Sequence, residues 1–222
     1  MSPAYFVTGT DTGVGKTAIT CGLLRAFARA GRRAVGMKPV AAGSENGRWE
    51  DVERHRAASG VTAPRTLVNP LAFDPPIAPH IAAEAANRPL LIEPLVAAYR
   101  ELRTYADVVV IEGAGGFMVP LNARETSADL ARALAAPVVL VVGMRLGCLS
   151  HALLTQEAIL SRGLALAGWV ANVLVPDMPY LERNIATLDE RLRAPRLGTV
   201  PHRLGLSDDG VADQLTLAKL AA

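Results

Sequence analysis

The chain reads Gly9-Thr10-Asp11-Thr12-Gly13-Val14-Gly15-Lys16-Thr17 directly after a short apolar segment, residues 5–7. A helical pattern follows, so the order is strand, glycine-rich turn and helix N-terminus. Backbone N–H groups converge at such a turn, and the helix dipole favours negative charge there. In this pattern Lys16 reaches the β- and γ-phosphates and the Thr17 hydroxyl ligates Mg²⁺. Gly9 lies one residue earlier than the strict motif requires, but the order of elements still predicts a phosphate-binding loop.

Strand-like runs alternate with helical patterns along the rest of the chain. The expected strands are Ala4–Thr8, Ala34–Lys38, Asp107–Glu112, Pro137–Gly143, Leu166–Leu174 and Leu197–Val200. The expected helices are Thr17–Ala30, Glu50–Ala58, Ile77–Ala86, Ile92–Thr104, Ser127–Ala135, Ser150–Arg162 and Tyr180–Arg193. The strands are almost continuously apolar, as in a parallel sheet that is buried on both faces. The sequence therefore predicts an α/β fold: a single P-loop NTPase-like domain over residues 1–222, with a mostly parallel central sheet and helices on both faces.

Composition excludes several classes of function. Half of the 222 residues are apolar, which is enough for a sizeable core. The net charge is only +2, the charges are interspersed and aromatic residues are scarce, so we expect no nucleic-acid partner. The longest apolar stretch, residues 133–144, is too short for the ~20 helical residues that span a bilayer, so we expect no membrane partner. We expect no signal peptide, and the two cysteines, Cys21 and Cys148, have no C-x-x-C spacing, which favours the reducing cytoplasm.

Charged residues follow or close two of the expected strands. Ligands of open α/β sheets bind beyond the carboxyl ends of the strands. Glu112 closes an apolar strand and precedes a glycine turn, the arrangement of the second metal-holding element in P-loop proteins. Lys38 ends another strand, where its ammonium group and that of Lys16 would neutralise a transferring phosphoryl group or hold an anionic acceptor. A solvated lysine at a strand end is the alternative interpretation of Lys38.

Other polar residues carry weaker signals. Asp51, in the first turn of a helix, is either a further Mg²⁺ ligand or an acid favoured by the helix dipole. Cys148 is expected to be structural, with a Cys–His nucleophile pair as the alternative. The Pro-rich segment Asn69–His80 could be a linker, but its apolar residues and the helix that follows favour a rigid loop at the active site. No two of the histidines have metal-ligand spacing, so we expect surface or packing roles for all four: His55, His80, His151 and His202.

Taken together, several segments resemble the dethiobiotin synthetase family. The matching stretches are Gly9–Thr17, Met37–Glu45, Pro79-His80, Val109–Gly116, Val139–His151, Leu166–Asn172 and Leu197–Pro201. They span nearly the whole chain in the order of the family. No single motif is diagnostic, but the combination of KPVAAGSE, EGAGG and LGCLSHALLT is highly specific.

The resemblance implies a ligase that joins 7,8-diaminononanoate and CO₂ in an ATP- and Mg²⁺-dependent ring closure. In the family, one amine captures CO₂ as a carbamate, whose oxygen attacks the γ-phosphorus to give a carbamic–phosphoric mixed anhydride. The second amine then closes a five-membered ureido ring and expels phosphate. No protein nucleophile is needed, which agrees with the lack of a convincing serine or cysteine constellation. The resemblance also implies a homodimer.

Residue roles follow by matched position. The implied catalytic residues are Lys16, Lys38 and Thr12. The implied Mg²⁺ ligands are Thr17, Asp51 and Glu112. The implied nucleotide-binding residues are Gly13, Val14, Gly15, Lys16, Thr17, Ala18, Glu112, Gly113, Asn172 and Pro201, with the Asn172 amide reading the adenine edge. The implied substrate-binding residues are Thr12, Lys38, Ala42, Pro79, Gly147, Cys148 and Ser150, of which the last three lie near the partner subunit.

The chain departs from the family pattern at three positions. Ala42 stands where Ser or Thr is common, Gly13 replaces an acidic residue of some members, and Arg145 stands where others have Lys. These changes leave the ATP chemistry intact but affect the expected substrate contacts. Near Asp51 the match is loose, so Glu50 or Glu53 is an alternative ligand.

The alternative function is a dimer-switch, partitioning-type ATPase. Such proteins carry an extra lysine five residues before the phosphate-loop lysine, and Asp11 occupies that position here. A GTPase would need an Asn-Lys-x-Asp stretch, whereas Asn172 continues as Val173-Leu174. An amidotransferase would need a glutaminase domain, for which the chain has no room. These comparisons favour the synthetase.

Overall fold

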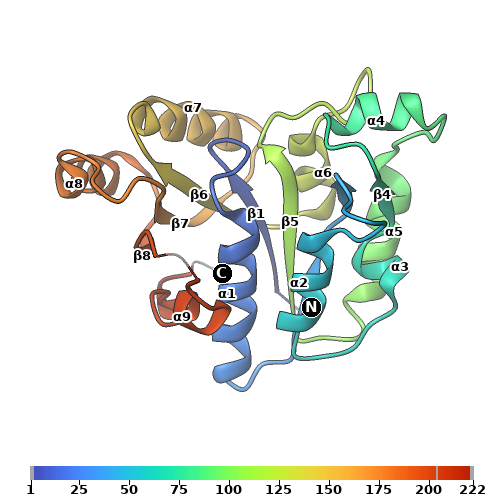
Figure 1. Cartoon of the computed structure of the whole chain (residues 1–222), viewed down its shortest axis with the longest axis horizontal. Coiled ribbons are helices and arrows are strands. Elements are labelled where there is room, and N and C mark those ends of the chain that lie inside the picture. The colour runs from blue at the N-terminus through green and yellow to red at the C-terminus, as the bar shows by residue number, and fades with distance from the viewer. Residues whose placement is uncertain (1–2, 204, 221–222) are drawn as a thin grey trace.

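The computed structural model describes residues 3–203 and 205–220, and within them a six-stranded sheet forms the centre of the molecule (Figure 1). Its strands are β1 (Ala4–Gly9), β2 (Ala34–Met37), β5 (Val108–Gly116), β6 (Val138–Met144), β7 (Leu166–Val173) and β8 (Arg196–Val200). The strand order is β2-β5-β1-β6-β7-β8, and neighbouring strands run parallel. The chain passes from β1 out to β2 and later crosses to β6 on the other side of β1. A ligand is therefore expected beyond the carboxyl end of β1.

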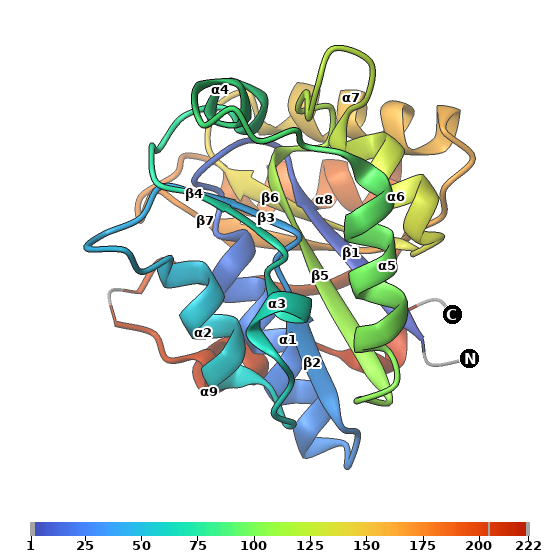
Figure 2. The same ribbon diagram turned by 90° about the vertical axis from the view of Figure 1, so that its right-hand side faces the viewer.

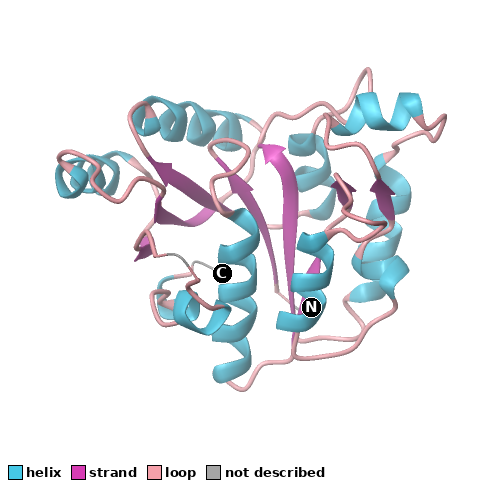
Figure 3. Cartoon of the chain, in the orientation of Figure 1, coloured by secondary structure: helices cyan, strands magenta, loops and turns pink. Residues whose placement is uncertain are grey.

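Helices cover both faces of this sheet (Figures 2 and 3). They are α1 (Lys16–Arg29), α2 (Glu50–Ala58), α3 (Arg65–Val68), α4 (Pro79–Ala85), α5 (Ile92–Leu102), α6 (Ser127–Leu134), α7 (Cys148–Ser161), α8 (Leu181–Arg191) and α9 (Asp208–Ala212), with a short 3₁₀ turn at Leu217–Lys219. Helices α1 and α9 pack on one face, and α5 to α8 pack on the other. None of the helices within the described residues is both long enough and apolar enough to cross a bilayer.

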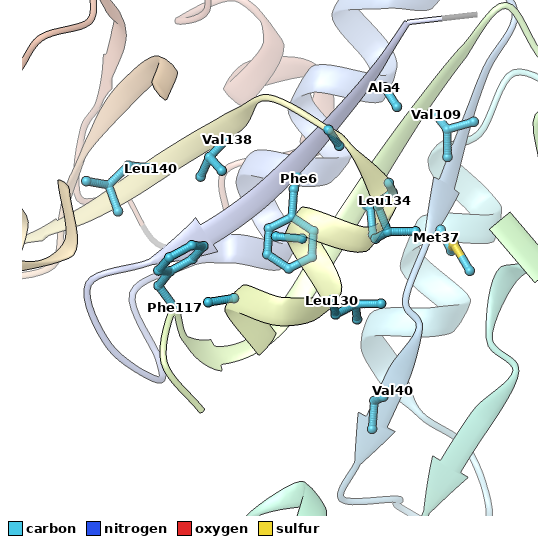
Figure 4. Close-up of a cluster of buried hydrophobic side chains, with 14 of the residues drawn as sticks. Ala4, Phe6, Met37, Val40, Val109, Phe117, Leu130, Leu134, Val138 and Leu140 are labelled. Atoms are coloured by element: carbon cyan, nitrogen blue, oxygen red, sulfur yellow. The ribbon is translucent and has the colours of Figure 1, made fainter. Parts of the chain in front are cut away.

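Alternate residues of the central strands belong to two different hydrophobic clusters. Phe6 packs among the α6 side chains Leu130 and Leu134 (Figure 4). Tyr5 and Val7 belong to the other cluster, which includes the buried side chains of α1. Side chains point to opposite faces along a strand, so an uninterrupted apolar run fills both layers of the core. This packing is the reason that the strands of the sheet were predictable from their hydrophobicity.

Several elements were not expected from the sequence, among them helices α3 and α9 and two short strands. Strands β3 (Val40–Ala42) and β4 (Leu71–Phe73) form a separate parallel pair, and each is too short to stand out as an apolar run. The first lies in the loop after β2, and the second lies inside the predicted Pro-rich loop. Helix α4 begins at Pro79, two residues later than predicted, because Pro suits the first turn of a helix, where its missing N–H costs nothing.

Candidate functional site

A cleft of about 710 Å³ opens beyond the carboxyl ends of β1, β2 and β5. Many of the predicted site residues line it: Thr12, Gly13, Gly15, Lys16, Thr17, Ala18, Lys38, Ala42, Asp51, Pro79 and Glu112. The Pro-rich segment contributes its last part, residues 76–79. The cleft therefore joins segments that are far apart in the sequence but end at one edge of the sheet.

The phosphate loop takes backbone conformations that glycine allows. Gly13 has a φ of 74° and Gly15 a φ of 90°, both in the left-handed region. Asn172 Nδ2 donates a hydrogen bond to the Val14 carbonyl at 2.8 Å and lies so close to Gly15 that a Cβ there would collide with it. The loop then leads into α1, whose first turn carries no acidic residue. The free N–H groups at a helix start make this loop a binding site for an anion.

Lys16 is the first residue of α1, and its ammonium group lies against the loop. Its Nζ donates to the Asp11 carbonyl at 3.0 Å, and the residue is buried. Burial lowers the pKa of Lys16 to about 8, with repulsion from Lys38 acting in the same direction and attraction by Glu112 opposing it. A desolvated ammonium group of this kind gains most when a phosphate anion binds beside it.

Lys38 is buried, which excludes the solvated alternative for this residue. Its Nζ lies 2.6 Å from Glu112 Oε1 and 2.7 Å from Asp51 Oδ2. Burial alone would lower the pKa of Lys38, but the Glu112 and Asp51 carboxylates outweigh it and hold the pKa above its ordinary value. Lys38 thus bridges two of the predicted metal ligands as a fully charged group.

Glu112 lies inside β5 and does not close it, so the predicted strand end was wrong. The strand continues to Gly116 because β1 keeps pairing with it as far as Gly9. Burial would raise the pKa of Glu112, but the Lys38 charge and a hydrogen bond from His55 hold it far below its ordinary value. The Thr17 hydroxyl donates to Glu112 Oε1 at 3.1 Å, which joins the phosphate loop to this carboxylate.

Sequence reasoning missed two residues of α2 that belong to the site. His55 is completely buried, and its Nε2 lies 2.7 Å from Glu112 Oε2. Arg54 lines the cleft and donates to Asp208 Oδ1 of α9 at 2.6 Å. Their spacing from Asp51, at i+3 and i+4, places them on its face of the helix and was the available signal.

Several predicted residues lie outside the lining of the cleft. Val14, Gly113, Asn172 and Pro201 do not contribute to it, although Asn172 supports the loop from β7. Gly147, Cys148 and Ser150, at the start of α7, do not contribute either. Arg145, in the same region, forms an ion pair with Asp11. The structure therefore leaves the adenine contacts and the α7 contacts as predictions.

The residues present fit a magnesium ion in the cleft. Thr17, Asp51 and Glu112 offer oxygen atoms, the ligand type that Mg²⁺ prefers, and both carboxylates contact one cation already, Lys38. Within the described part of the chain, no group of three or more His, Cys, Asp or Glu residues is arranged to hold a metal. This donor set suits an ion that takes its remaining ligands from phosphates and water.

A parallel sheet of this strand order, with a glycine-rich loop entering α1 and a buried acid on the neighbouring strand, defines the class of P-loop nucleotide-binding proteins. A family model described as an AAA domain matches residues 3–209. The ATP-dependent dethiobiotin synthetase BioD of Nitrosospira multiformis is 51% identical over 99% of this chain and 97% of that protein. The protein of the same name from Pseudomonas aeruginosa is 52% identical over 98% of each chain. The chain belongs to the dethiobiotin synthetase family, which confirms the resemblance seen in its motifs.

Solved structures with low identity share the fold. The septum site-determining protein MinD from Pyrococcus horikoshii, complexed with Mg-ADP, aligns with a TM-score of 0.60 at 15% identity, covering 96% of this chain and 86% of that one. A ParA family ATPase from Chlorobium tepidum aligns with a TM-score of 0.58 at 9% identity, covering 97% and 91%. These likenesses confirm the predicted fold class. They do not favour the partitioning ATPase, because a likeness at such identity shows the fold alone.

Proposed function

We propose that this protein is an ATP-dependent dethiobiotin synthetase, a ligase that closes a ureido ring on 7,8-diaminononanoate with CO₂. One amine adds to CO₂ and loses a proton to form a carbamate. A carbamate oxygen attacks the γ-phosphorus of ATP, and ADP leaves. The second amine attacks the carbonyl carbon of the mixed anhydride and loses a proton, phosphate leaves, and the ring closes as dethiobiotin.

The observation that carries this proposal is the second buried lysine in the cleft. Lys16 serves the triphosphate, as in any phosphate loop. Lys38 adds another ammonium group from a different strand, and both line the same cleft. A reaction between two anions, a carbamate and a γ-phosphate, needs two sources of positive charge to hold them together. The synthetase relatives, similar over nearly their whole length, support the same activity.

The residues of the cleft divide into three roles. Gly13, Gly15, Lys16 and Ala18 would hold phosphates through backbone N–H groups and the ammonium group. Thr12 and Lys38 would orient the carbamate, with Ala42 and Pro79 as walls of the diamine site. Thr17, Asp51 and Glu112 would hold Mg²⁺, which neutralises charge on the β- and γ-phosphates when it is bound. Positioning and charge neutralisation are the main demands of phosphoryl transfer on a protein.

Two further features belong to the proposal. A homodimer is supported by Leu146, which is 99% exposed in the turn before α7, and by Leu154, which is 65% exposed on α7. In a dimer, Gly147, Cys148 and Ser150 would meet the substrate carboxylate near the partner subunit. A single domain and a cytoplasmic location are also proposed. The two clusters packed on one sheet support the first, and the free thiols of Cys21 and Cys148 support the second.

An isotope experiment tests the activity directly. The protein is incubated with labelled bicarbonate, ATP and Mg²⁺, with and without 7,8-diaminononanoate. We expect acid-stable label in dethiobiotin, and phosphate release in equal amount, only when the diamine is present. Phosphate release that ignores the diamine would exclude a synthetase and favour a switch ATPase.

A further inference from the structure

His55 is a completely buried titratable residue beside the cleft, and the proposed reaction does not use it. The side chain is 0% exposed and lies on α2, one helical turn after Asp51. The same face of the helix thus presents Asp51 to the cleft and His55 to the strand behind it.

Among residues 3–203 and 205–220, the imidazole makes one polar contact, and that contact is to Glu112. Its Nε2 lies 2.7 Å from Glu112 Oε2. The other carboxylate oxygen, Oε1, accepts from Lys38 Nζ at 2.6 Å and from the Thr17 hydroxyl at 3.1 Å. The two oxygens are therefore used differently: Oε2 is turned to the histidine, and Oε1 is turned to the groups of the cleft.

The remaining surroundings of His55 position the ring without a second side-chain hydrogen bond from the described residues. Among the residues that the structure describes, its Nδ1 has no hydrogen-bond partner. Gly36 of β2 gives the ring its room, because a Cβ at that position would lie 2.9 Å from His55 Cβ. Ser59 links helix and strand nearby: its hydroxyl donates to the His55 carbonyl at 2.7 Å and accepts from the Gly36 N–H at 3.0 Å. A ring seated this firmly, with Nε2 carrying the proton, is a fixed hydrogen-bond donor.

We propose that His55 is a positioning residue that holds Glu112 with Oε1 directed toward the metal of MgATP. Carboxylates that ligate metals are commonly oriented by hydrogen bonds to their other oxygen, and loss of such a partner costs about 10- to 100-fold in metal affinity or activity. The inference rests on the proposed function, because it takes Mg²⁺ as the partner of Glu112. It assigns to this chain's own histidine a task that a packing role would not include.

Two variants of similar side-chain shape distinguish the role of His55 as a hydrogen-bond donor from a role in packing. His55→Gln keeps an N–H at the end of an unbranched side chain, and His55→Met has nearly the same length and flexibility but no donor. Binding of adenylyl imidodiphosphate is measured by calorimetry for wild type and both variants, without Mg²⁺ and over a Mg²⁺ titration. Turnover is measured over the same titration, and thermal unfolding checks the fold.

We expect the variants to differ in their response to Mg²⁺ but not in their binding of the metal-free nucleotide. All three proteins bind the metal-free nucleotide alike. In His55→Met, the Mg²⁺ concentration for half-maximal effect rises by about 10- to 100-fold, and kcat falls, whereas His55→Gln stays close to wild type. A folded His55→Met with the Mg²⁺ dependence of wild type would overturn the proposal. Equal losses in the two variants would also overturn it, because they would indicate packing alone.

The same measurements keep the two proposals apart. If His55→Met does not fold, His55→Gln decides: a folded Gln variant that loses its Mg²⁺ response contradicts the donor role, and one that retains the response supports it. If Mg²⁺ does not strengthen nucleotide binding even in wild type, the metal site of the proposed function fails, and the role of His55 fails with it. A normal Mg²⁺ response in all three proteins would contradict the role of His55 but leave the proposed function intact.

Discussion

Two ion pairs join the segments of β2 and β5, one just before both strands begin and one where β2 ends, beside Glu112 inside β5. At the amino end, Arg33 Nη2 lies 2.9 Å from Asp107 Oδ1, and the side chains are 62% and 35% exposed. At the carboxyl end, Lys38 Nζ lies 2.6 Å from Glu112 Oε1, and the side chains are 6% and 1% exposed. The N–O distances in the two pairs are similar, but the exposure of the side chains is very different.

The covering segments account for the difference. At the carboxyl end, the phosphate loop, α2 and the Pro-rich segment close around Lys38 and Glu112. At the amino end, short turns leave Arg33 and Asp107 in contact with water. Charges in water gain little from pairing, whereas charges removed from water depend strongly on each other. The segments that cover each end of the sheet therefore determine whether an ion pair there is exposed or buried.

Removing the buried cation should have the largest effect. Lys38→Met is expected to lower kcat for dethiobiotin formation by about 10²- to 10³-fold, the usual loss when one electrostatic stabiliser of a transition state is removed. Nucleotide binding should remain measurable, because Lys16 and the phosphate loop are intact. Arg33→Met is the matched control and should keep wild-type turnover. A strong loss of ATP affinity with normal chemistry would contradict the role of Lys38.

Stability should follow the same contrast. Lys38→Met leaves Glu112 buried beside His55 without its main cation, and breaking such a pair costs about 3–5 kcal/mol. Urea denaturation measures the change. The double variant Lys38→Met/Glu112→Gln should regain much of the loss, because it removes the stranded charge. Asp107→Asn should unfold almost like wild type, and if it proves as harmful as Lys38→Met, burial is not the cause of the contrast.

A smaller loss of stability is expected when a methyl group is added beside the buried ion pair without a change of charge. In Gly36→Ala, the new Cβ would press against the His55 side chain, and overpacking of this kind costs about 1–3 kcal/mol. The Mg²⁺ concentration that gives half-maximal turnover should rise as well. Gly60→Ala is the control, since its Cβ would lie 3.6 Å from Ala34 N, an ordinary contact. Equal melting temperatures for the two variants would contradict this prediction and show that the residues around His55 rearrange to accept the added methyl group.

The smallest effect concerns the exposed pair and its pH dependence. Hydrogen bonds from the Arg33 side chain and backbone hold the pKa of Asp107 below its ordinary value. A lowered folded-state pKa gives stability that is present above the unfolded-state pKa and is lost as the pH falls through the folded-state value. The small advantage of wild type over Asp107→Asn should therefore shrink between about pH 5 and pH 2. Denaturation curves at several pH values test this, and an advantage that grows in acid would contradict it.

Some of the site could be predicted because its signals are local. Lys16 and Thr17 follow a glycine-rich turn, and Lys38 follows a strand, so their positions were clear from the neighbouring residues. Position alone did not reveal that Lys38 is buried, because a lysine at a strand end is equally at home in water. His55 was expected to be a surface or packing histidine, since nothing adjacent to it in sequence shows that β5 brings Glu112 against its ring.

Local sequence by itself determined the phosphate loop, the parallel strands and the alternation of strand and helix. These features depend on glycine conformations and on apolar runs, which act over a few residues. Only the tertiary structure decided the partners of Glu112, because Lys38, His55 and Thr17 lie 74, 57 and 95 residues away from it. Burial of a charge depends on every segment packed around it, and those segments meet only when the whole chain has folded.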